Sequence, residues 1–441
     1  MPAVLGDRRG LSFLKWLYPG MHVKRWLLLL MVGIALMGLG IAYLLREIYA
    51  VYTFPDFVYY VTLQFLPRYL RAGLFFLLSG GIIVVAFWQL NRSLLAALLP
   101  AGHTGNIVDT VYQYRQLQRG PKIVAVGGGT GLSTLLRGLR EHTVNLTAIL
   151  TVADDGGSSG RLRRELGVLP PGDFRNCIAA LADAEPLMTR LFQYRFQEGN
   201  GLEGHSFGNL FIAAMSAIVG DFAQAIRESS RVLAVRGQIL PSTLANVTLL
   251  ADMEDADTIR GESSITSSYK RIRRVYLEPE DAQAFPEALR ALLEADLIIA
   301  GPGSLFTSVL PNLLVDGIRN AILASQAVKV YVCNVATQRG ETDGYDVAQH
   351  VEALERHVGK GLFNCVVANT NLSGEFQPRW QVGPVCLDGW RPEEIRVMGA
   401  DLVSDDSPLR HDPRKLSAAL LRLLEEASTE KARGGRLVEV G

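Results

Sequence analysis

The chain has 441 residues, which is enough for one large domain or two ordinary ones. Its charge is balanced, with Lys+Arg 44 against Asp+Glu 44, so the composition gives no sign of a nucleic-acid-binding protein. Hydrophobic residues make up 49% of the chain, and the N-terminal sequence explains this high share.

Cysteine and histidine are sparse and scattered. The four cysteines form no C-x-x-C pair, which is typical of reduced thiols in a cytosolic domain. The seven histidines show neither H-x-x-x-H nor H-E-x-x-H spacing, which argues against a zinc site built only from protein ligands.

Two long apolar runs lie near the N-terminus, Trp26 to Leu45 and Ala72 to Leu90. Each is long enough as a helix, at about 1.5 Å per residue, to cross a bilayer core of ~30 Å. A cleaved signal peptide is disfavoured because the first run is too long and a second follows. A soluble core hairpin is disfavoured because neither run has a polar face. Residues 1–95 are therefore predicted to be a membrane anchor with two transmembrane helices, and without ionisable residues in the runs a transport path is not expected.

The flanking cations predict how this anchor is oriented. Basic residues precede the first run and follow the second, namely Arg8, Arg9, Lys15, Lys24, Arg25, Arg92, Arg115, Arg119 and Lys122. The connection carries Arg46, Arg68 and Arg71, so the asymmetry is moderate. The distribution predicts a multi-pass protein of the cell inner (plasma) membrane with both termini and the C-terminal domain in the cytoplasm.

After a predicted linker, 96–119, the pattern from 120 to 427 is α/β. The apolar strand candidates are KIVAV, LTAILTV, DLIIAGPG, VKVYVCNV and NCVVANT, with helical patterns between them. They predict a doubly wound, mostly parallel Rossmann-like sheet whose strands are covered on both faces. A long excursion, helical over 173–235 and strand-like over 238–277, is predicted to be a helical/β insertion on the substrate side. A helix over 413–427 and a loose charged tail, 428–441, complete the expected organisation.

The stretch from Lys122 to Leu136 has a buried strand, a glycine cluster and the start of a helix. Glycines lack a Cβ, so a ligand can approach the main chain closely, and the helix N-terminus favours an anion. The stretch predicts a phosphate-binding turn, although glycine clusters also make plain strand-to-helix turns. Its candidate ligand-binding residues are Gly127, Gly128, Gly129, Thr130 and Gly131.

Asp154 and Asp155 follow the second strand, so both should face the crevice at the strand ends. One carboxylate could hold a ribose hydroxyl, and the pair could hold Mg²⁺, although Asp-Asp-Gly-Gly is also ordinary turn chemistry. The small-residue loop that follows offers Ser158, Ser159 and Arg161, whose hydroxyl and guanidinium groups suit phosphate oxygens.

Two further motifs open helices. In PPGDFRNC, Asp173 is a natural N-cap, whereas Arg175 and Asn176 have no such structural explanation and are candidates to face the ligand. In GHSFGN, His205 and Asn209 could touch a substrate, although a lone histidine is more often structural.

A second strand, glycine turn and helix occur at GPGSLFTSVLP. Its hydroxyls lie near a helix N-terminus, and the loop after the next strand places polar side chains at the same sheet edge. The candidate residues of these two segments are Gly303, Ser304, Thr307, Ser308, Asn334 and Thr337.

Taken in order, GGGTGLSTLLRGLR, TVADDGGSSGRLR, PPGDFRNCIAAL, GHSFGNLFIAA, GPGSLFTSVLPNLLV and CNVATQRGETDGY resemble the gluconeogenesis factor (YvcK-type) branch of the CofD-like superfamily. The likeness covers about Lys122 to Leu424 and implies a Rossmann-like CofD fold. It also implies binding of UDP-sugars such as UDP-N-acetylglucosamine, and a role in gluconeogenic growth, cell shape and envelope synthesis. The superfamily's other branch, 2-phospho-L-lactate transferase, moves a phospholactyl group from a nucleotide diphosphate carrier with Mg²⁺.

Carried over by motif, Gly127 to Gly131 with Asp154 and Asp155 would bind the nucleotide or Mg²⁺. The hydroxyls from Ser304 to Ser308 would hold phosphates, and Asn334 with Thr337 would line the uridine or sugar end. The chain departs from the branch's usual soluble form by its two apolar runs. It also departs from the transferase branch in its acidic patterning around Asp173.

Three functions compete. The first is a membrane-tethered regulatory protein that binds a UDP-sugar, and the lack of a visible nucleophile and base pair weakly supports it. The second is a Mg²⁺-dependent transferase of a phospholactyl-type group, with Asp154 or Asp155 on the metal and Arg161 on the leaving pyrophosphate. The third, a nicotinamide dehydrogenase, is disfavoured because Gly127-x-Gly129-x-x-Leu132 lacks the third glycine. A homo-oligomer is expected in the first two cases.

Overall fold

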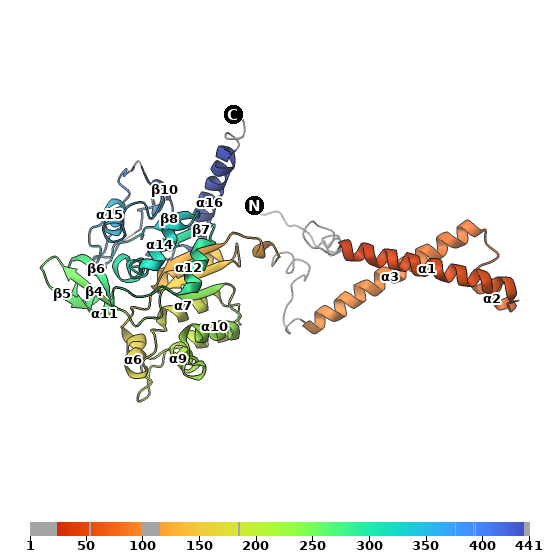
Figure 1. Cartoon of the computed structure of the whole chain (residues 1–441), viewed down its shortest axis with the longest axis horizontal. Coiled ribbons are helices and arrows are strands. Elements are labelled where there is room, and N and C mark those ends of the chain that lie inside the picture. Colours follow the sequence, from red (N-terminus) through yellow and green to blue (C-terminus); the bar gives the residue numbers. More distant parts are fainter. Residues whose placement is uncertain are drawn as a thin grey trace. The chain divides into compact units, whose positions relative to one another are not determined.

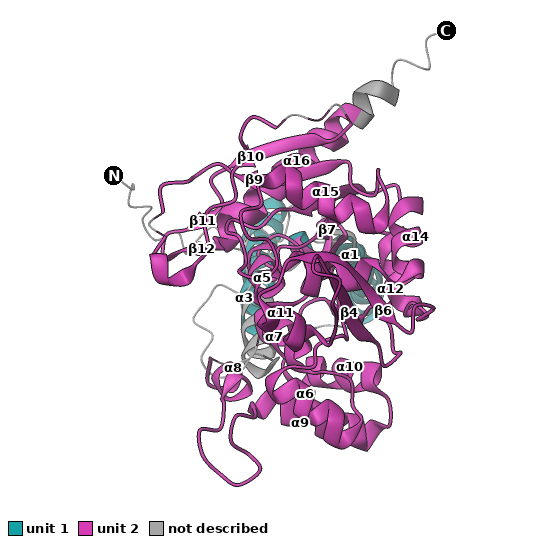
Figure 2. Ribbon diagram, turned by 90° about the vertical axis from the view of Figure 1, so that its left-hand side faces the viewer, with its two compact units in different colours: residues 1–116 teal, residues 117–441 magenta. Residues whose placement is uncertain are grey.

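The structure, a computed structural model, describes residues 24–98 and 115–435 apart from 53, 184–185, 375, 391 and 393. It divides into two compact units, Met1–Gln116 and Leu117–Gly441 (Figure 2). Three of the predicted flanking cations, Arg8, Arg9 and Lys15, lie outside the described residues, as do residues 99–114 of the predicted linker.

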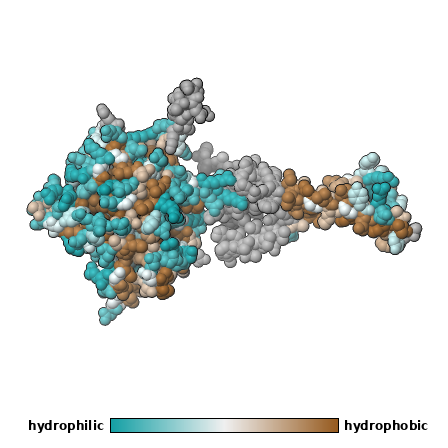
Figure 3. Space-filling model, in the orientation of Figure 1, coloured by the Kyte–Doolittle hydropathy of each residue, from teal (hydrophilic) through white to brown (hydrophobic). Residues whose placement is uncertain are grey.

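Unit 1 contains the two predicted apolar helices. They are α1 (Lys24–Val51) and α3 (Arg68–Leu98), with the short α2 (Asp56–Val61) between them. The stretches Leu28–Val51 and Arg68–Ala86 have mean hydropathies of 2.5 and 1.9 and bury none of their side chains inside the structure. Figure 3 shows hydrophobic residues over much of the part of this unit that is drawn in colour. By length and composition, both helices could cross a membrane.

Unit 2 is built on a seven-stranded sheet in the order β10-β9-β8-β7-β1-β2-β3. All neighbouring strands pair in parallel, which confirms the doubly wound α/β fold. The strands are β1 (Ile123–Gly127), β2 (Leu146–Leu150), β3 (Gln238–Pro241), β7 (Leu297–Ala300), β8 (Val328–Val332), β9 (Cys365–Asn369) and β10 (Arg396–Ala400). The strand order reverses between β1 and β7, so the crevice at their carboxyl ends is the topological switch point.

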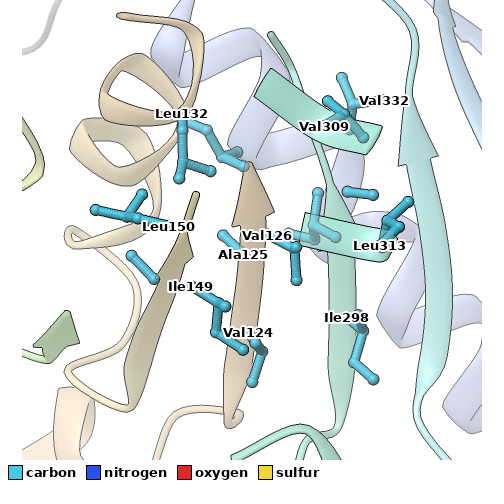
Figure 4. Packing of buried hydrophobic residues seen from close by; sticks show 14 of the residues in the cluster. Val124, Ala125, Val126, Leu132, Ile149, Leu150, Ile298, Val309, Leu313 and Val332 are labelled. Atoms are coloured by element: carbon cyan, nitrogen blue, oxygen red, sulfur yellow. The ribbon is translucent and has the colours of Figure 1, made fainter. Parts of the chain in front are cut away.

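The central strands are fully buried because helices cover both faces of the sheet. Figure 4 shows Val124, Val126 and Ile298 between the covering helices, which contribute Leu132 and Leu313. The helices of unit 2 are α5 (Gly129–Leu139), α6 (Gly157–Leu166), α7 (Gly172–Leu181), α8 (Pro186–Gln193), α9 (Phe207–Val219), α10 (Phe222–Val232), α11 (Glu262–Ser268), α12 (Pro286–Leu293), α13 (Leu310–Leu313), α14 (Asp316–Ala324), α15 (Val347–Val358) and α16 (Pro413–Gly435).

Three features of the fold differ from the sequence-based prediction. Strand β3, at the start of the strand-like part of the predicted insertion, belongs to the main sheet, and β10 adds an unpredicted strand at the other edge. The insertion proper is a three-stranded antiparallel sheet with α11, at the left of unit 2 in Figure 1; its strands are β4 (Thr248–Met253), β5 (Thr258–Arg260) and β6 (Ile272–Glu278). Helix α16 continues to Gly435, because its good helix formers extend well into the predicted tail.

The two glycine turns interlock where β1 and β7 end. The backbone N–H of Gly301 donates to the carbonyl of Val126, and the Asn312 side chain donates to the carbonyl of Gly127 at 3.0 Å. A Cβ on Gly131 would lie 2.5 Å from the carbonyl oxygen of Pro302. Glycine is therefore required at position 131 by the close approach of the other turn.

Gly131→Ala is expected to destabilise unit 2 by roughly 1–3 kcal/mol, because backbone must move to admit the methyl group. This cost should exceed the ~0.5–1 kcal/mol that alanine gains in a helix. Thermal or urea unfolding of the two proteins checks the difference. Gly383→Ala is the matched control, since a Cβ there meets nothing within 4 Å. Equal stability of the two variants would contradict the interlock.

Candidate functional site

An open cleft of about 730 Å³ lies at the switch point of the sheet. Its walls come from the first glycine turn with α5, the second glycine turn, the loop after β8, helix α11 and the segment before α16. The predicted residues that line it are Gly128, Gly129, Thr130, Gly131, Asn176, Gly303, Ser304, Thr307, Ser308, Asn334 and Thr337. Segments far apart in the sequence thus meet in one crevice, as the strand order requires.

The backbone of the first glycine turn donates a hydrogen bond to a carboxylate. Helix α5 begins at Gly129, which has a φ of 66°, a conformation that favours glycine. Asp173 accepts a hydrogen bond from the Gly129 N–H, and a Cβ on Gly128 would lie 2.5 Å from its Oδ2 atom. Asp173 is not the N-cap predicted from the sequence, because α7 starts at Gly172 with Pro171 as its N-cap.

Three more acids gather beside Asp173. Burial, together with the charge of Asp154, raises the pKa of Asp173 to about 6. Burial also raises the pKa of Glu262 to about 8, with added repulsion from Asp154 and Asp155. We call Asp154, Asp155, Asp173 and Glu262 the acid cluster. Because burial and like charges disfavour the charged form, Glu262 keeps much of its proton at neutral pH.

The two predicted metal ligands have different surroundings. The Oδ1 atom of Asp155 accepts from the Ser263 N–H at 2.8 Å and so satisfies the N-terminus of α11. Asp154 uses Oδ1 to accept from the Gly156 N–H at 2.9 Å. Its Oδ2 atom faces Gly172, next to Asp173. Neither aspartate lines the cleft itself.

Two of the hydroxyls predicted for phosphate, those of Ser304 and Thr307, donate to a buried carboxylate instead. Glu341 is 4% exposed and accepts from the side chains of Ser304, Thr307 and Thr266. Burial raises the pKa of Glu341, and these hydrogen bonds partly oppose the effect. Ser304 also caps the π-helical turn Leu305–Val309. A phosphate at these hydroxyls would have to replace Glu341 or meet it in the protonated form.

Asn334 and Thr337 hold the cleft walls in place. The Asn334 amide accepts from the Gly303 N–H at 3.1 Å and donates to the Gly303 carbonyl at 2.8 Å. The Thr337 hydroxyl accepts from the Gly383 N–H at 2.9 Å. Both side chains therefore have a structural reason to be polar, in addition to facing the cleft.

Three positively charged side chains line the cleft, those of Arg137, Arg339 and Arg410. All are exposed, and among the described residues none of them forms an ion pair. The guanidinium of Arg339 lies 4.1 Å from the ring centroid of Tyr269. Sequence reasoning did not select Arg137 or Arg410. The spacing of Thr130, Thr134 and Arg137, at i, i+4 and i+7 on α5, was the available signal for the first.

The other predicted residues lie behind the cleft in a buried polar network. The Ser158 hydroxyl lies 2.9 Å from Nδ1 of His205 and accepts from the Asn209 amide at 3.1 Å. Arg175 donates to Ser206 and to Asn176, and Asn176 alone of this group lines the cleft. Ser159 accepts from the Gly172 N–H and Arg161 donates to the Glu203 carbonyl, both away from the cleft.

The acid cluster is the place where Mg²⁺ would fit. In the part of the chain that the structure describes, no group of three or more His, Cys, Asp or Glu side chains surrounds one point. Mg²⁺ commonly takes only one or two carboxylates and completes its shell with water and phosphate oxygens. Asp154 and Asp173 repel each other beside the glycine turn, so a cation between them and a phosphate would relieve that repulsion. Asp154 and Asp173 are therefore the side chains that could share a Mg²⁺ ion with a phosphate, and both lie just behind the lining of the cleft.

Comparison with known proteins identifies the family of this chain. The family model of 2-phospho-L-lactate transferase CofD matches residues 123–407. The gluconeogenesis factor of Bacillus subtilis is 49% identical over 313 residues, covering 69% of this chain and 99% of that protein. The chain belongs to the gluconeogenesis factor group of the CofD family.

Two further comparisons show which parts of the chain resemble known proteins. A gluconeogenesis factor relative from Nostoc sp. is 47% identical over 424 residues, 93% of this chain and 92% of that protein, so its similarity extends into unit 1. A crystal structure of a UPF0052-family protein from Bacillus halodurans, at 2.60 Å resolution, has a TM-score of 0.64 and 46% identity. It covers 68% of this chain and 99% of its own.

Glu262→Gln is expected to change stability with a defined pH dependence. Between its ordinary pKa of 4.5 and about 8, the folded protein keeps a proton on Glu262 that the unfolded chain has lost. The free energy of unfolding therefore falls as pH rises through this window. Glutamine mimics the protonated acid, so the variant should be more stable than the wild type above pH 8 and similar to it near pH 4.5.

Thermal unfolding across this pH range checks the sign. Glu294→Gln is the control, since its hydrogen bond with Lys122 lowers the pKa of Glu294 and no gain at high pH should follow. A stability difference for Glu262→Gln that does not vary with pH would contradict the buried, repelled carboxyl.

Proposed function

We propose that the cleft binds a nucleotide diphosphate sugar of the UDP-N-acetylglucosamine class, and that the protein acts as a regulator. The observation that carries this proposal is the pairing of two glycine turns with three arginines that lack ion-pair partners among the described residues. Main-chain N–H groups and guanidinium forks are the groups that recognise diphosphates. A cleft of about 730 Å³ is also within the ~300–1,000 Å³ range of small-molecule sites.

The groups around the cleft fit the separate parts of such a ligand. The diphosphate lies over Gly129 and Gly131, with Arg137 and Arg410 on its oxygens. The carboxyls of Glu262 and Glu341 serve the sugar hydroxyls, because a partly protonated carboxyl both donates and accepts. The uridine end lies toward Asn334 and Thr337, as the family resemblance implies.

Mg²⁺ would be held by Asp154 and Asp173 together with a phosphate oxygen. When bound, the ion supplies positive charge that neutralises the diphosphate next to the acid cluster. Without it, the Asp173 carboxylate on the Gly129 N–H would repel the phosphate. The nucleotide sugar should therefore bind more tightly with Mg²⁺ present.

A regulatory role fits the site better than turnover does. The Ser158 and His205 pair is buried away from the cleft, so it does not face a ligand bound there. The name of the matching family model nevertheless keeps a phospholactyl-type transferase as the alternative. Consumption of a nucleotide diphosphate carrier with Mg²⁺ and an acceptor, seen by product analysis, would favour that alternative.

The proposal includes a membrane anchor and a cellular role for the protein. The helices α1 and α3 anchor the protein in the inner membrane as a homo-oligomer, with unit 2 in the cytoplasm. Their apolar side chains are exposed in the described structure, and the hydrocarbon core of a membrane would cover them. At the membrane, a nucleotide-sugar signal would link carbon metabolism to cell shape and envelope synthesis.

Arg410→Gln and Arg137→Gln should each weaken binding of UDP-N-acetylglucosamine about tenfold, since each removes a charged hydrogen bond worth ~1.5–3 kcal/mol. Calorimetric titration of the full chain in detergent with Mg²⁺ measures the change. Arg414→Gln is the matched control, because Arg414 is exposed, lies four residues further along in α16 and does not line the cleft. No binding by the wild type, or equal binding by all four proteins, would contradict the proposal.

The full chain should stay in the membrane pellet after carbonate extraction, whereas a chain that starts at residue 115 should be released. The expectation follows from the length and apolarity of α1 and α3. In intact cells, protease added outside should leave unit 2 uncut. Release of the full chain by carbonate, or external cleavage within unit 2, would overturn the anchor or its orientation respectively.

A further inference from the structure

Three arginines lie in or beside the polar network behind the cleft: Arg175 is buried, Arg161 is half-buried and Arg195 is exposed. Arg161, Arg175 and Arg195 come from α6, α7 and the segment after α8. Arg175 donates to the Ser206 side chain, and Arg195 pairs with Ser206 in an isolated β-bridge, so both arginines lie next to Ser206. Burial and then Arg161 lower the pKa of His205. Arg195 also lowers the pKa of His205, whereas the nearby Glu165 raises it.

Each arginine in this network bonds only to neutral groups. Arg161 donates to the carbonyl of Glu203 and Arg195 to the carbonyl of Gly204. Arg175 donates to the Ser206 hydroxyl and the Asn176 amide. Among the described residues, no carboxylate forms an ion pair with any of the three. Asp173 and Asp154 lie near Arg175, and Glu165 lies near His205, but among the described residues none of these carboxylates bonds to the three arginines. A buried cation without a bonded counter-charge is costly.

Two buried polar atoms in the same network have no partner. Arg175 is 8% exposed, and its Nε atom donates to nothing in the described structure. Asn209 is 2% exposed, and its Oδ1 atom is likewise unpartnered. Such groups are rare in folded proteins and indicate a missing water or ligand. For Arg175, whose N–H is charged, an anion is the partner with the larger gain.

Two helix N-termini converge on the same place. The Asn209 amide, in the first turn of α9, donates to Ser158 in the first turn of α6 at 3.1 Å. Figures 1 and 2 show the two helices next to each other at the lower end of unit 2. Their positive dipole ends add to the arginine charges.

We infer that Arg161, Arg175 and Arg195, with Ser206, form a second anion subsite for the phosphomonoester group of a small metabolite. A phosphomonoester carries about −1.5 to −2 charge and three acceptor oxygens, which matches three guanidinium groups better than a carboxylate does. The subsite adjoins the cleft through Asn176, which bonds to Arg175 and lines the cleft. It is formed by residues other than the glycine turns, so it does not rest on the nucleotide-sugar proposal.

The test is a titration of the full chain in detergent with inorganic phosphate and with methyl phosphate, before and after saturation with UDP-N-acetylglucosamine. Both probes should bind in both conditions. Arg161→Gln and Arg195→Gln should each weaken binding about tenfold, the loss expected for one charged hydrogen bond. Arg195 is exposed, so its variant should fold normally, as circular dichroism will check. Arg190→Gln, on α8 and also exposed, is the matched control and should bind as the wild type does.

Several results would overturn the inference. The first is no phosphate binding by the wild type. The second is binding that Arg137→Gln abolishes and Arg161→Gln and Arg195→Gln leave intact, which would place phosphate in the cleft. The third is acetate binding more tightly than phosphate, which would make the anion class wrong. If phosphate binding depends on Arg161 and Arg195 but UDP-N-acetylglucosamine does not bind, the proposed function fails and this inference stands.

Discussion

The packing of the two glycine turns against each other is the constraint on which the rest of unit 2 depends. The turns follow β1 and β7, the strands at which the sheet order reverses. Because no side chain separates Gly131 from Pro302, the main chains themselves form the floor of the cleft. A floor of main-chain groups is suited to phosphate and poorly suited to apolar ligands.

The charges around this floor are divided between two sides. Arginines from α5, the loop after β8 and the segment before α16 face the cleft, while carboxyls from α7 and α11 lie beneath and beside it. The carboxyls hold several polar groups in place, since Asp155 binds the N-terminus of α11 and Glu341 collects three hydroxyls. An anionic ligand is therefore attracted by one wall and needs a cation or a proton at the other.

Strand and turn chemistry allowed much of this architecture to be predicted. Five of the seven sheet strands are apolar runs, and the two glycine turns follow two of them directly. The two edge strands were the weak point of the prediction: β3 was assigned to the insertion and β10 was not predicted. At these edges Gln238 and Arg396 face solvent and break the apolar pattern. The opening of α7 was misjudged, because Asp173 has the residue type of an N-cap but bonds to a glycine turn far away in sequence.

The sequence alone also could not show that the predicted site residues lie in two separate regions, the cleft and the network behind it. Arg175 and Asn176 are adjacent, yet a helix directs one side chain into the buried network and the other toward the cleft. Arg410 reaches the cleft only because β12 (Ser407–His411) packs near α5, a contact between segments distant in the chain. Local patterns indicate which residues have unusual chemistry, but long-range packing decides which of them meet.

The central claim is that both glycine turns form one ligand site. Hydrogen–deuterium exchange on the full chain in detergent, with and without saturating UDP-N-acetylglucosamine and Mg²⁺, tests it most directly. We expect the ligand to slow exchange together in the peptides that contain Gly127–Gly131 and Gly301–Ser304. Slowed exchange confined to other segments, or to only one of the two turns, would contradict the account.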